Sequence, residues 1–225
     1  QASRDCCIKP TPTPMSIDSV VPSCPGSKEG PAASDRLAKA VWLSLLVASF
    51  WTSGVVFGWP ALVLILNDEG VYTELCEGVA RDCAARQDRL SLVFSSGFFC
   101  LLGGRLFWGI FLDRSGPRLT GALSACLVVI GALLLTVCFA FPDVDVLAPA
   151  FALTGLGGPG VHLASFHVSN LFPKIKRTVT ASFSGVFGTS GLVFVLLRAV
   201  YSGGVVSAVQ ITAAYSVIVA CVVVL

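Results

Sequence analysis

Residues 109–118 read Gly-Ile-Phe-Leu-Asp-Arg-Ser-Gly-Pro-Arg, and they join two long apolar segments, 90–112 and 119–141. Each segment is close to the roughly 20 residues that a helix needs to cross about 30 Å of hydrocarbon. Three charged side chains and the pair Gly116–Pro117 lie at the junction. Gly and Pro favour a tight turn between antiparallel helices. The stretch therefore predicts a helical hairpin whose turn lies at a membrane surface.

The composition of the whole chain also predicts a membrane protein. Of the 225 residues, 55% are hydrophobic and only 12% are charged, and the mean hydropathy is +0.83. Soluble domains carry roughly 25% charged residues, so this chain has too little polar surface for a water-soluble globule of its size. The formal net charge of +2 and the lack of a basic stretch interleaved with aromatic residues exclude an evident nucleic-acid-binding protein.

Six apolar segments follow a polar N-terminal region. They comprise residues 40–66, 90–112, 119–141, 146–172, 179–201 and 205–225. We expect helices rather than barrel strands, because the runs are long and continuous and lack alternation of polar and apolar residues. The predicted fold class is all-α, a polytopic membrane bundle of six helices over residues 37–225. Because residue 1 is Gln and the last residues are still apolar, we expect a longer native protein.

Residues 1–36 are expected to form a disordered cytosolic tail. The region is rich in Pro, Ser and Thr and has no apolar periodicity, so it cannot bury enough apolar surface to offset the entropy of ordering. It also lacks the basic start and apolar core of a signal peptide.

The distribution of Lys and Arg predicts that the N-terminus lies in the cytosol. With this orientation, eight basic residues lie on the cytosolic side: Lys28, Arg36, Lys39, Arg114, Arg118, Lys174, Lys176 and Arg177. Four lie on the opposite side: Arg81, Arg86, Arg89 and Arg198. The excess lies beside the shorter loops, as the positive-inside rule requires. Cys76 and Cys83 then lie in the long outer loop, in an oxidising compartment, and we predict a disulfide between them.

The junction at residues 109–118 also matches a family motif. Its Gly109, Asp113, Arg114, Gly116 and Arg118 fit the pattern G-x-x-x-D-R-x-G-x-R, which resembles the cytosolic loop between spans 2 and 3 of major facilitator transporters. In that family the motif latches two six-helix halves together when the carrier faces outward. The resemblance implies the N-terminal half of a 12-helix fold, with the second half absent here. The alternative is a basic turn that serves only the positive-inside rule.

A closer resemblance runs from about residue 40 to the end of the chain. It rests on Gly58-Trp59-Pro60, the pair Cys76 and Cys83, and Asn170-Leu171-Phe172, in that order. This series looks like solute carrier family 43, the equilibrative transporters of large neutral amino acids and of purine nucleobases. The resemblance implies a facilitative plasma-membrane carrier of neutral amino acids that works by alternating access and needs no cofactor. A purine nucleobase carrier is the alternative.

Four parts of the apolar segments are candidates for contact with solute. Pro60 lacks a backbone N–H, so it weakens the helix one turn earlier. Together with Gly58 and Trp59 it marks a bend of the kind that recurs in transporters. Thr189 and Ser190 fall near the bilayer centre, where carriers bind their solutes. The alternatives are a packing kink and hydroxyls bonded to their own backbone.

The fourth segment is the most polar. Its His162, Ser165 and Ser169 are spaced i, i+3 and i+7, which predicts one helical face. Polar groups at this depth face a bundle interior or an aqueous cavity. The alternative for His162 is a buried, hydrogen-bonded helix residue. His167 is five residues from His162, and without further ligands the two do not make a metal site.

Arg105 lies inside an apolar segment, where an uncharged residue is expected. It either snorkels to the cytosolic interface or faces a polar cavity, where it would bind a carboxylate of the solute. The only carboxylate in these segments is Asp113, at the membrane edge, so facilitated diffusion fits better than proton symport.

The sequence predicts that the chain is not an enzyme. Apart from His162 and His167 it offers nothing from which to build a nucleophile–base pair or a metal cluster in the membrane. The expected partners are a small solute, the lipid bilayer and the second six-helix half. If the chain is complete, a non-transporting membrane scaffold remains as a further alternative.

Overall fold

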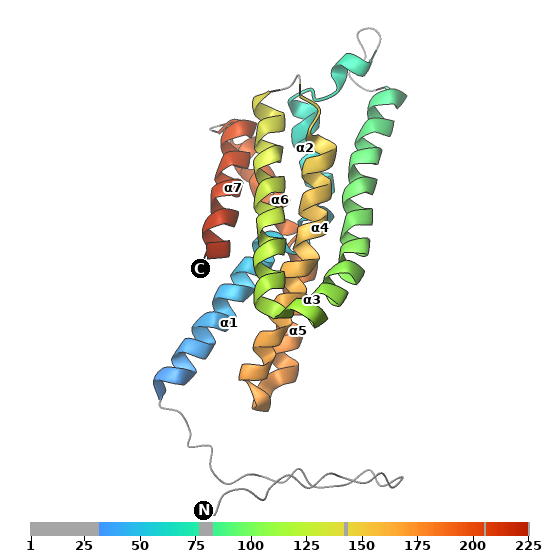
Figure 1. Ribbon diagram of the computed structural model, residues 1–225. Coiled ribbons are helices and arrows are strands. Elements are labelled where there is room, and N and C mark those ends of the chain that lie inside the picture. The colour runs from blue at the N-terminus through green and yellow to red at the C-terminus, as the bar shows by residue number, and fades with distance from the viewer. Residues whose placement is uncertain (1–31, 77–82, 142–143, 205, 225) are drawn as a thin grey trace, which may run out of the picture.

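A computed structural model describes residues 32–76, 83–141, 144–204 and 206–224, and these form a bundle of helices without strands (Figure 1). The α-helices are α1 Ala32–Thr52, α2 Trp59–Asp68, α3 Ala84–Ala140, α4 Leu147–Ser165, α5 Lys176–Thr189, α6 Leu192–Ser202 and α7 Ala208–Val224. Short 3-10 helices lie at Val55–Gly58 (η1), Thr73–Leu75 (η2), Phe166–Leu171 (η3) and Pro173–Ile175 (η4). The prediction of an all-α chain is confirmed for the described residues.

Among these helices, α3 is long and apolar enough by itself to cross a membrane. Two bent helix pairs also qualify if each pair counts as one span. The first pair, Arg36–Thr52 with Val55–Asp68, is bent by 46°, and the second, Pro173–Thr189 with Leu192–Ser202, is bent by 42°. The described part of the chain therefore has one clear apolar span, or three if the bent pairs are included.

Helix α3 consists of two antiparallel arms that join at Gly116. Gly116 has φ 79° and ψ 169°, a conformation that residues with a β-carbon rarely adopt. Pro117 follows at the start of the second arm, where its missing N–H has no helical partner to lose. In Figure 1 the arms diverge from this turn. The hairpin expected from residues 109–118 is therefore present.

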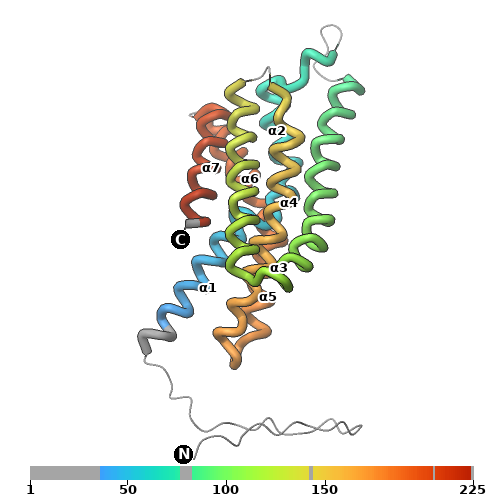
Figure 2. Tube along the Cα trace, viewed as in Figure 1, coloured from blue at the N-terminus to red at the C-terminus, as the bar shows by residue number. Residues whose placement is uncertain are grey.

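The first apolar segment is broken, although the sequence suggested one helix with a bend. The helix α1 begins at Ala32, inside the expected tail, whereas residues 1–31 lie outside the described part of the chain. Thr52 and Ser53 donate their hydroxyls to the carbonyls four residues earlier, at 2.7 Å and 2.5 Å. Such bonds compete with the backbone and bend helices. The chain then changes direction and continues as η1 and α2 (Figure 2).

Glycines allow α4 to pack closely against both arms of α3 and against α1. A β-carbon on Gly157 would lie 2.6 Å from the Ser124 carbonyl oxygen, and one on Gly158 would lie 2.5 Å from that of Ser53. On the other arm, Gly155 lies against the backbone of Gly97. Small residues permit such backbone contact between membrane helices. Because of these contacts, α4 occupies the centre of the helices that form the candidate site.

Helix α7 covers the second arm of α3 and the end of α1 (Figure 2). The Tyr215 hydroxyl donates to the Trp51 carbonyl at 3.2 Å, in the last turn of α1. The last four carbonyls of a helix have no intrahelical donor, so this bond satisfies one of them. Thr136 and Ser216 hydrogen-bond at 3.0 Å and connect α3 to α7. The break in the first segment is thus supported by a partner more than 160 residues away in sequence.

Candidate functional site

The two helix breaks lie against each other, backbone to backbone. A β-carbon on Gly58 would lie 2.5 Å from the Gly191 carbonyl oxygen, at the break between α5 and α6. One on Gly54 would lie 2.5 Å from the Phe187 carbonyl oxygen. A side chain at either position would force the two bent pairs apart. The bend that the sequence predicted near Gly58 is therefore also a contact surface for the second bent pair.

The residues next to these breaks mostly have structural contacts. Trp59 is half-buried and packs on Phe151, with ring centroids 4.9 Å apart, while Pro60 is exposed in the first turn of α2. Thr189 is exposed and donates to carbonyls of its own helix at 3.2 Å. Ser190 is buried and donates to the Phe187 carbonyl at 2.7 Å. The Thr189 and Ser190 hydroxyls therefore bond to the backbone of their own helix, which was the alternative to contact with solute.

The polar residues of the fourth segment do not share one α-helical face. The α-helix ends at Ser165, and Ser169 lies in η3, where each residue turns the chain further about its axis. Ser165 donates to the Val161 carbonyl at 2.7 Å and lies 3.4 Å from the Ser49 hydroxyl of α1. Ser165 and Ser169 are both buried. Ser169 therefore does not continue the α-helix that carries His162 and Ser165, because the helix type changes after Ser165.

His162 differs from its neighbours because it is buried without a hydrogen-bond partner for Nδ1. The residue is 4% exposed, and no described residue bonds to Nδ1. Its ring lies 4.6 Å from that of Phe166 and 4.8 Å from that of Phe187, between centroids. The sequence offered a buried, hydrogen-bonded helix residue as the alternative role for His162. Nδ1 does not fit that role, because it has no hydrogen-bond partner among the described residues. An unsatisfied buried polar atom costs about 1–3 kcal/mol.

Arg105 reaches across from α3 to α5. Its guanidinium carbon lies 4.4 Å from the ring centroid of Phe187, the geometry of a cation–π interaction. Phe57, which is 44% exposed, contacts the same ring edge-on at 5.6 Å. Phe57, Arg105, His162 and Phe187 thus meet around one ring and come from η1, α3, α4 and α5. We refer to these four residues as the Phe187 cluster.

The five residues of the loop motif lie at the turn of α3. Asp113, Arg114 and Arg118 are exposed, while Gly109 and Gly116 are partly covered. Between described residues, no hydrogen bond or ion pair holds the side chains of Asp113, Arg114 and Arg118. Their charges are therefore available at this end of the bundle.

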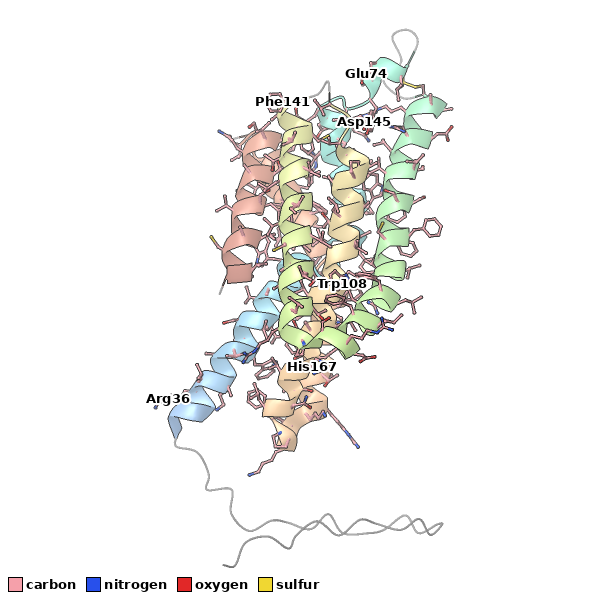
Figure 3. The ribbon with its side chains drawn as sticks, in the orientation of Figure 1. Arg36, Glu74, Trp108, Phe141, Asp145 and His167 are labelled. Carbon is pink, nitrogen blue, oxygen red and sulfur yellow. A yellow bond between two sulfur atoms is a disulfide. The ribbon has the colours of Figure 1, made fainter. Side chains whose placement is uncertain are left out.

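The opposite end of the bundle carries a set of polar contacts that sequence reasoning missed (Figure 3). The Tyr72 hydroxyl donates to Asp145 at 2.5 Å, and Arg89 forms an ion pair with the same carboxylate. Burial, and then the hydrogen bond to Asp145, raise the pKa of Tyr72. Burial alone would raise the pKa of Asp145, but the hydrogen bonds from Tyr72 and Arg89 and the Arg89 charge lower it below its ordinary value.

Further contacts tie the same end together. Arg86 is 2% exposed and donates to the Val71 carbonyl at 2.8 Å and to the Leu66 carbonyl at 3.3 Å. Arg198 of α6 pairs with Asp68 at the end of α2. Cys76 and Cys83 form a disulfide, with their Cα atoms 5.7 Å apart. The sequence predicted this disulfide, whose cysteines are seven residues apart, whereas the partners of Arg86 and Arg198 lie farther along the chain and no local pattern could have predicted them.

Comparison with known proteins finds relatives of this chain. The chain is 28% identical over 196 residues to the human large neutral amino acids transporter small subunit 3, which covers 78% of this chain and 34% of the relative. It is 29% identical over 163 residues to the equilibrative nucleobase transporter 1 of Bos taurus, covering 68% of this chain and 33% of the relative. The chain is similar to transporters.

A third relative is protein FMP42 of Saccharomyces cerevisiae, 31% identical over 155 residues, covering 67% of this chain and 31% of the relative. The chain therefore spans about a third of the length of the curated relatives it matches. No family model matches the chain, and no solved structure matches it significantly. The relatives named for an activity are transporters rather than enzymes, in agreement with the prediction of a non-enzymatic protein.

Proposed function

We propose that this chain is the N-terminal half of a facilitative carrier of neutral amino acids, of the major facilitator type and related to solute carrier family 43. The observation that carries the proposal is the backbone contact between two broken helices at Gly58 and Gly191. Carriers build their solute sites beside discontinuous helices, where unwound backbone and side chains face a cavity. Here the Phe187 cluster lies next to that contact and presents a cation and an aromatic ring.

Six spans are assigned in this proposal. They are α1 with α2, the two arms of α3, α4 with η3, α5 with α6, and α7. The N-terminus and the turn of α3 lie in the cytosol, consistent with the excess of Lys and Arg on that side. The second half, which the length of the relatives leaves room for, covers the exposed face at Phe57 and Arg105.

The two ends of the bundle are assigned different tasks in alternating access. The contacts of Tyr72, Arg86 and Arg198 hold the outer loops to the helices, so that this half moves as one body. At the cytosolic end, Asp113, Arg114 and Arg118 latch onto the second half when the carrier faces outward. Facilitated diffusion is favoured because the middles of the described apolar helices carry no carboxylate for proton coupling. Asp35, Asp68 and Asp88 lie near the ends of α1, α2 and α3, and Asp113 lies at the turn.

A nucleobase carrier is the second candidate function, and one observation favours it. The ring of Phe57 and the imidazole of His162 each lie within 6 Å of the Phe187 ring, between centroids, and such rings can stack on a planar base. One relative is itself named a nucleobase transporter.

The test is solute uptake by the full-length protein that contains this chain, expressed in cells. We expect uptake of labelled leucine, accelerated when unlabelled leucine is preloaded inside the cells, with no inward proton current. Adenine uptake without leucine uptake would replace the first candidate by the second. A proton current that accompanies leucine would contradict the facilitative mechanism, and transport of neither solute would refute both candidates.

A further inference from the structure

The strongest unexplained feature of the bundle is the contact of a cation and an unpartnered imidazole with the same aromatic ring. Arg105 and His162 both touch Phe187, at 4.4 Å and 4.8 Å from its centroid. Arg105 has no ion pair with any described residue, and Nδ1 of His162 has no hydrogen-bond partner. The ring of Phe187 therefore contacts two groups whose polar bonding is incomplete, the exposed guanidinium of Arg105 and the buried imidazole of His162.

The distances allow a single small solute to reach both groups. The sum of the two centroid distances, about 9 Å, is the upper limit on the separation between the guanidinium carbon and the imidazole centre. Two hydrogen bonds of about 3 Å each, with an α-amino acid head group between them, span a similar length. Hence one head group is long enough to reach both groups once the ring of Phe187 moves aside.

The guanidinium of Arg105 and the imidazole of His162 each favour a different charged group on the solute. A guanidinium binds a carboxylate with two parallel hydrogen bonds and stays charged in the membrane. A neutral imidazole has one nitrogen that accepts a hydrogen bond, and it can serve an ammonium. No carboxylate lies nearby in the described helices to take that role, since Asp113 is two helical turns beyond Arg105.

We propose that Arg105 and His162 form a two-point site for a zwitterionic α-amino acid, and that Phe187 plugs this site when it is empty. Arg105 binds the carboxylate of the solute, and His162 accepts a hydrogen bond from its ammonium. The solute replaces a cation–π contact by an ion pair and gives the imidazole a partner. This inference rests on the proposed transport of amino acids and assigns the groups that recognise them.

The first test needs no mutation. Binding of labelled leucine to the purified full-length carrier is competed with leucine, with leucinol, which lacks the carboxylate, and with 4-methylpentanoate, which lacks the ammonium. We expect each analogue to compete at least tenfold more weakly than leucine. If either analogue competes as well as leucine, the two-point site is wrong.

Variants then assign each end of the solute to its residue. We expect Arg105→Gln to weaken leucine binding ten- to hundredfold and to remove the preference for leucine over leucinol. Arg105→Lys should retain part of the leucine affinity and part of that preference. His162→Phe should remove the preference for leucine over 4-methylpentanoate, and His162→Asn, which keeps an acceptor, should restore it. Arg177→Gln, an equal charge change at the exposed start of α5, is the control and should bind leucine normally.

The outcomes separate this inference from the proposed function. If the wild-type protein transports leucine, but Arg105→Gln and His162→Phe bind it within twofold of wild type, only the two-point site falls. If the wild-type protein neither binds nor transports leucine, the proposed function and this inference fall together. The competition experiment on the wild-type protein can still overturn the two-point site even if a variant does not fold.

Discussion

The Gly191 carbonyl oxygen lies 2.5 Å from the position of a β-carbon on Gly58, so the two broken helices touch through their backbones. Gly58→Ala should therefore push the two bent pairs apart and lower the stability by about 1–3 kcal/mol, the usual range for overpacking. The check is the melting temperature of the purified full-length protein in detergent. Gly185→Ala is the matched control, because a β-carbon there meets nothing within 4 Å. Equal melting temperatures for the two variants would contradict the backbone contact.

A second prediction concerns the contact between α3 and α4. The indole N–H of Trp108 donates to the Leu156 carbonyl at 2.7 Å, and Trp108 is buried. Trp108→Phe keeps an aromatic ring but removes the indole donor, while the carbonyl keeps its place in the backbone ladder of α4. We expect a loss of about 0.5–1.5 kcal/mol, the net contribution of one hydrogen bond. Thermal melting measures it, and Phe107→Tyr, at an exposed neighbouring position, should melt as the wild type does.

A third prediction concerns the pH dependence of the outer end. The pKa of Asp145 is lowered in the folded protein, so its contribution to stability is full above the ordinary carboxyl value of about 3.8. It is lost as the pH falls below that value and passes through the lower folded pKa. Asp145→Asn should remove this acid-dependent component. Melting temperatures of wild type and variant, measured from pH 7 to about pH 3, should converge on acidification; a constant difference would refute the linkage.

The Tyr72 hydroxyl allows an independent test of the same contact. Tyr72→Phe removes one hydrogen bond to a charged carboxylate, which is worth about 1.5–3 kcal/mol before solvent screening. Because Asp145 is partly exposed, we expect the lower part of this range at pH 7. If Tyr72→Phe and Asp145→Asn act through one contact, the double variant should be no less stable than the worse single variant. Additive losses would show that the two side chains act separately.

A fourth prediction tests the disulfide and the proposed orientation together. Intact cells expressing the full-length protein are treated with a membrane-impermeant maleimide, with and without prior reduction. We expect labelling at Cys76 and Cys83 only after reduction, and none in the variant with both changed to Ser. Reduction should cost about 2 kcal/mol of stability, since the bridge closes a short loop. Labelling that requires permeabilised cells would overturn the orientation.

A fifth prediction distinguishes the residue at the turn of α3 that latches the two halves, Asp113, from the one that stabilises the turn, Gly116. Asp113 is exposed and has no bonded partner among the described residues, so Asp113→Asn should leave the melting temperature unchanged. Leucine uptake should nevertheless fall several-fold, because the latch acts on the second half. Gly116→Ala should act the other way and cost about 1–2 kcal/mol of stability, since φ is 79° there. An Asp113→Asn variant with normal uptake would reduce the motif to a basic turn.

Several features of the fold followed directly from local sequence. Gly116 and Pro117 predicted the turn of the hairpin, because positive φ and a missing N–H are properties of single residues. Long apolar runs predicted helices for a similar reason, since hydrocarbon leaves each backbone group to bond within its own helix. The bend near Pro60 was also predictable, although the back-bonding of Thr52 and Ser53 that moves it to residue 53 was not.

The candidate site depended on contacts that no local pattern encodes. The sequence singled out Arg105 and His162 as polar residues in apolar segments, but it left open whether Arg105 snorkels to the interface. Phe187, an ordinary apolar residue by its sequence context, joins the two. Likewise, Tyr72 and Asp145 are 73 residues apart and meet only because two loops lie at the same end of the bundle.

The sequence by itself therefore determined that this protein is helical, apolar and turned at Gly116, because these properties depend on neighbouring residues and on the solvent. Only the tertiary structure decided that the break at Gly58 meets the break at Gly191, and that Phe187 brings Arg105 and His162 together. The physical reason is that close contacts between helices depend on the fit of whole helix surfaces, including glycines that no hydrophobic pattern distinguishes.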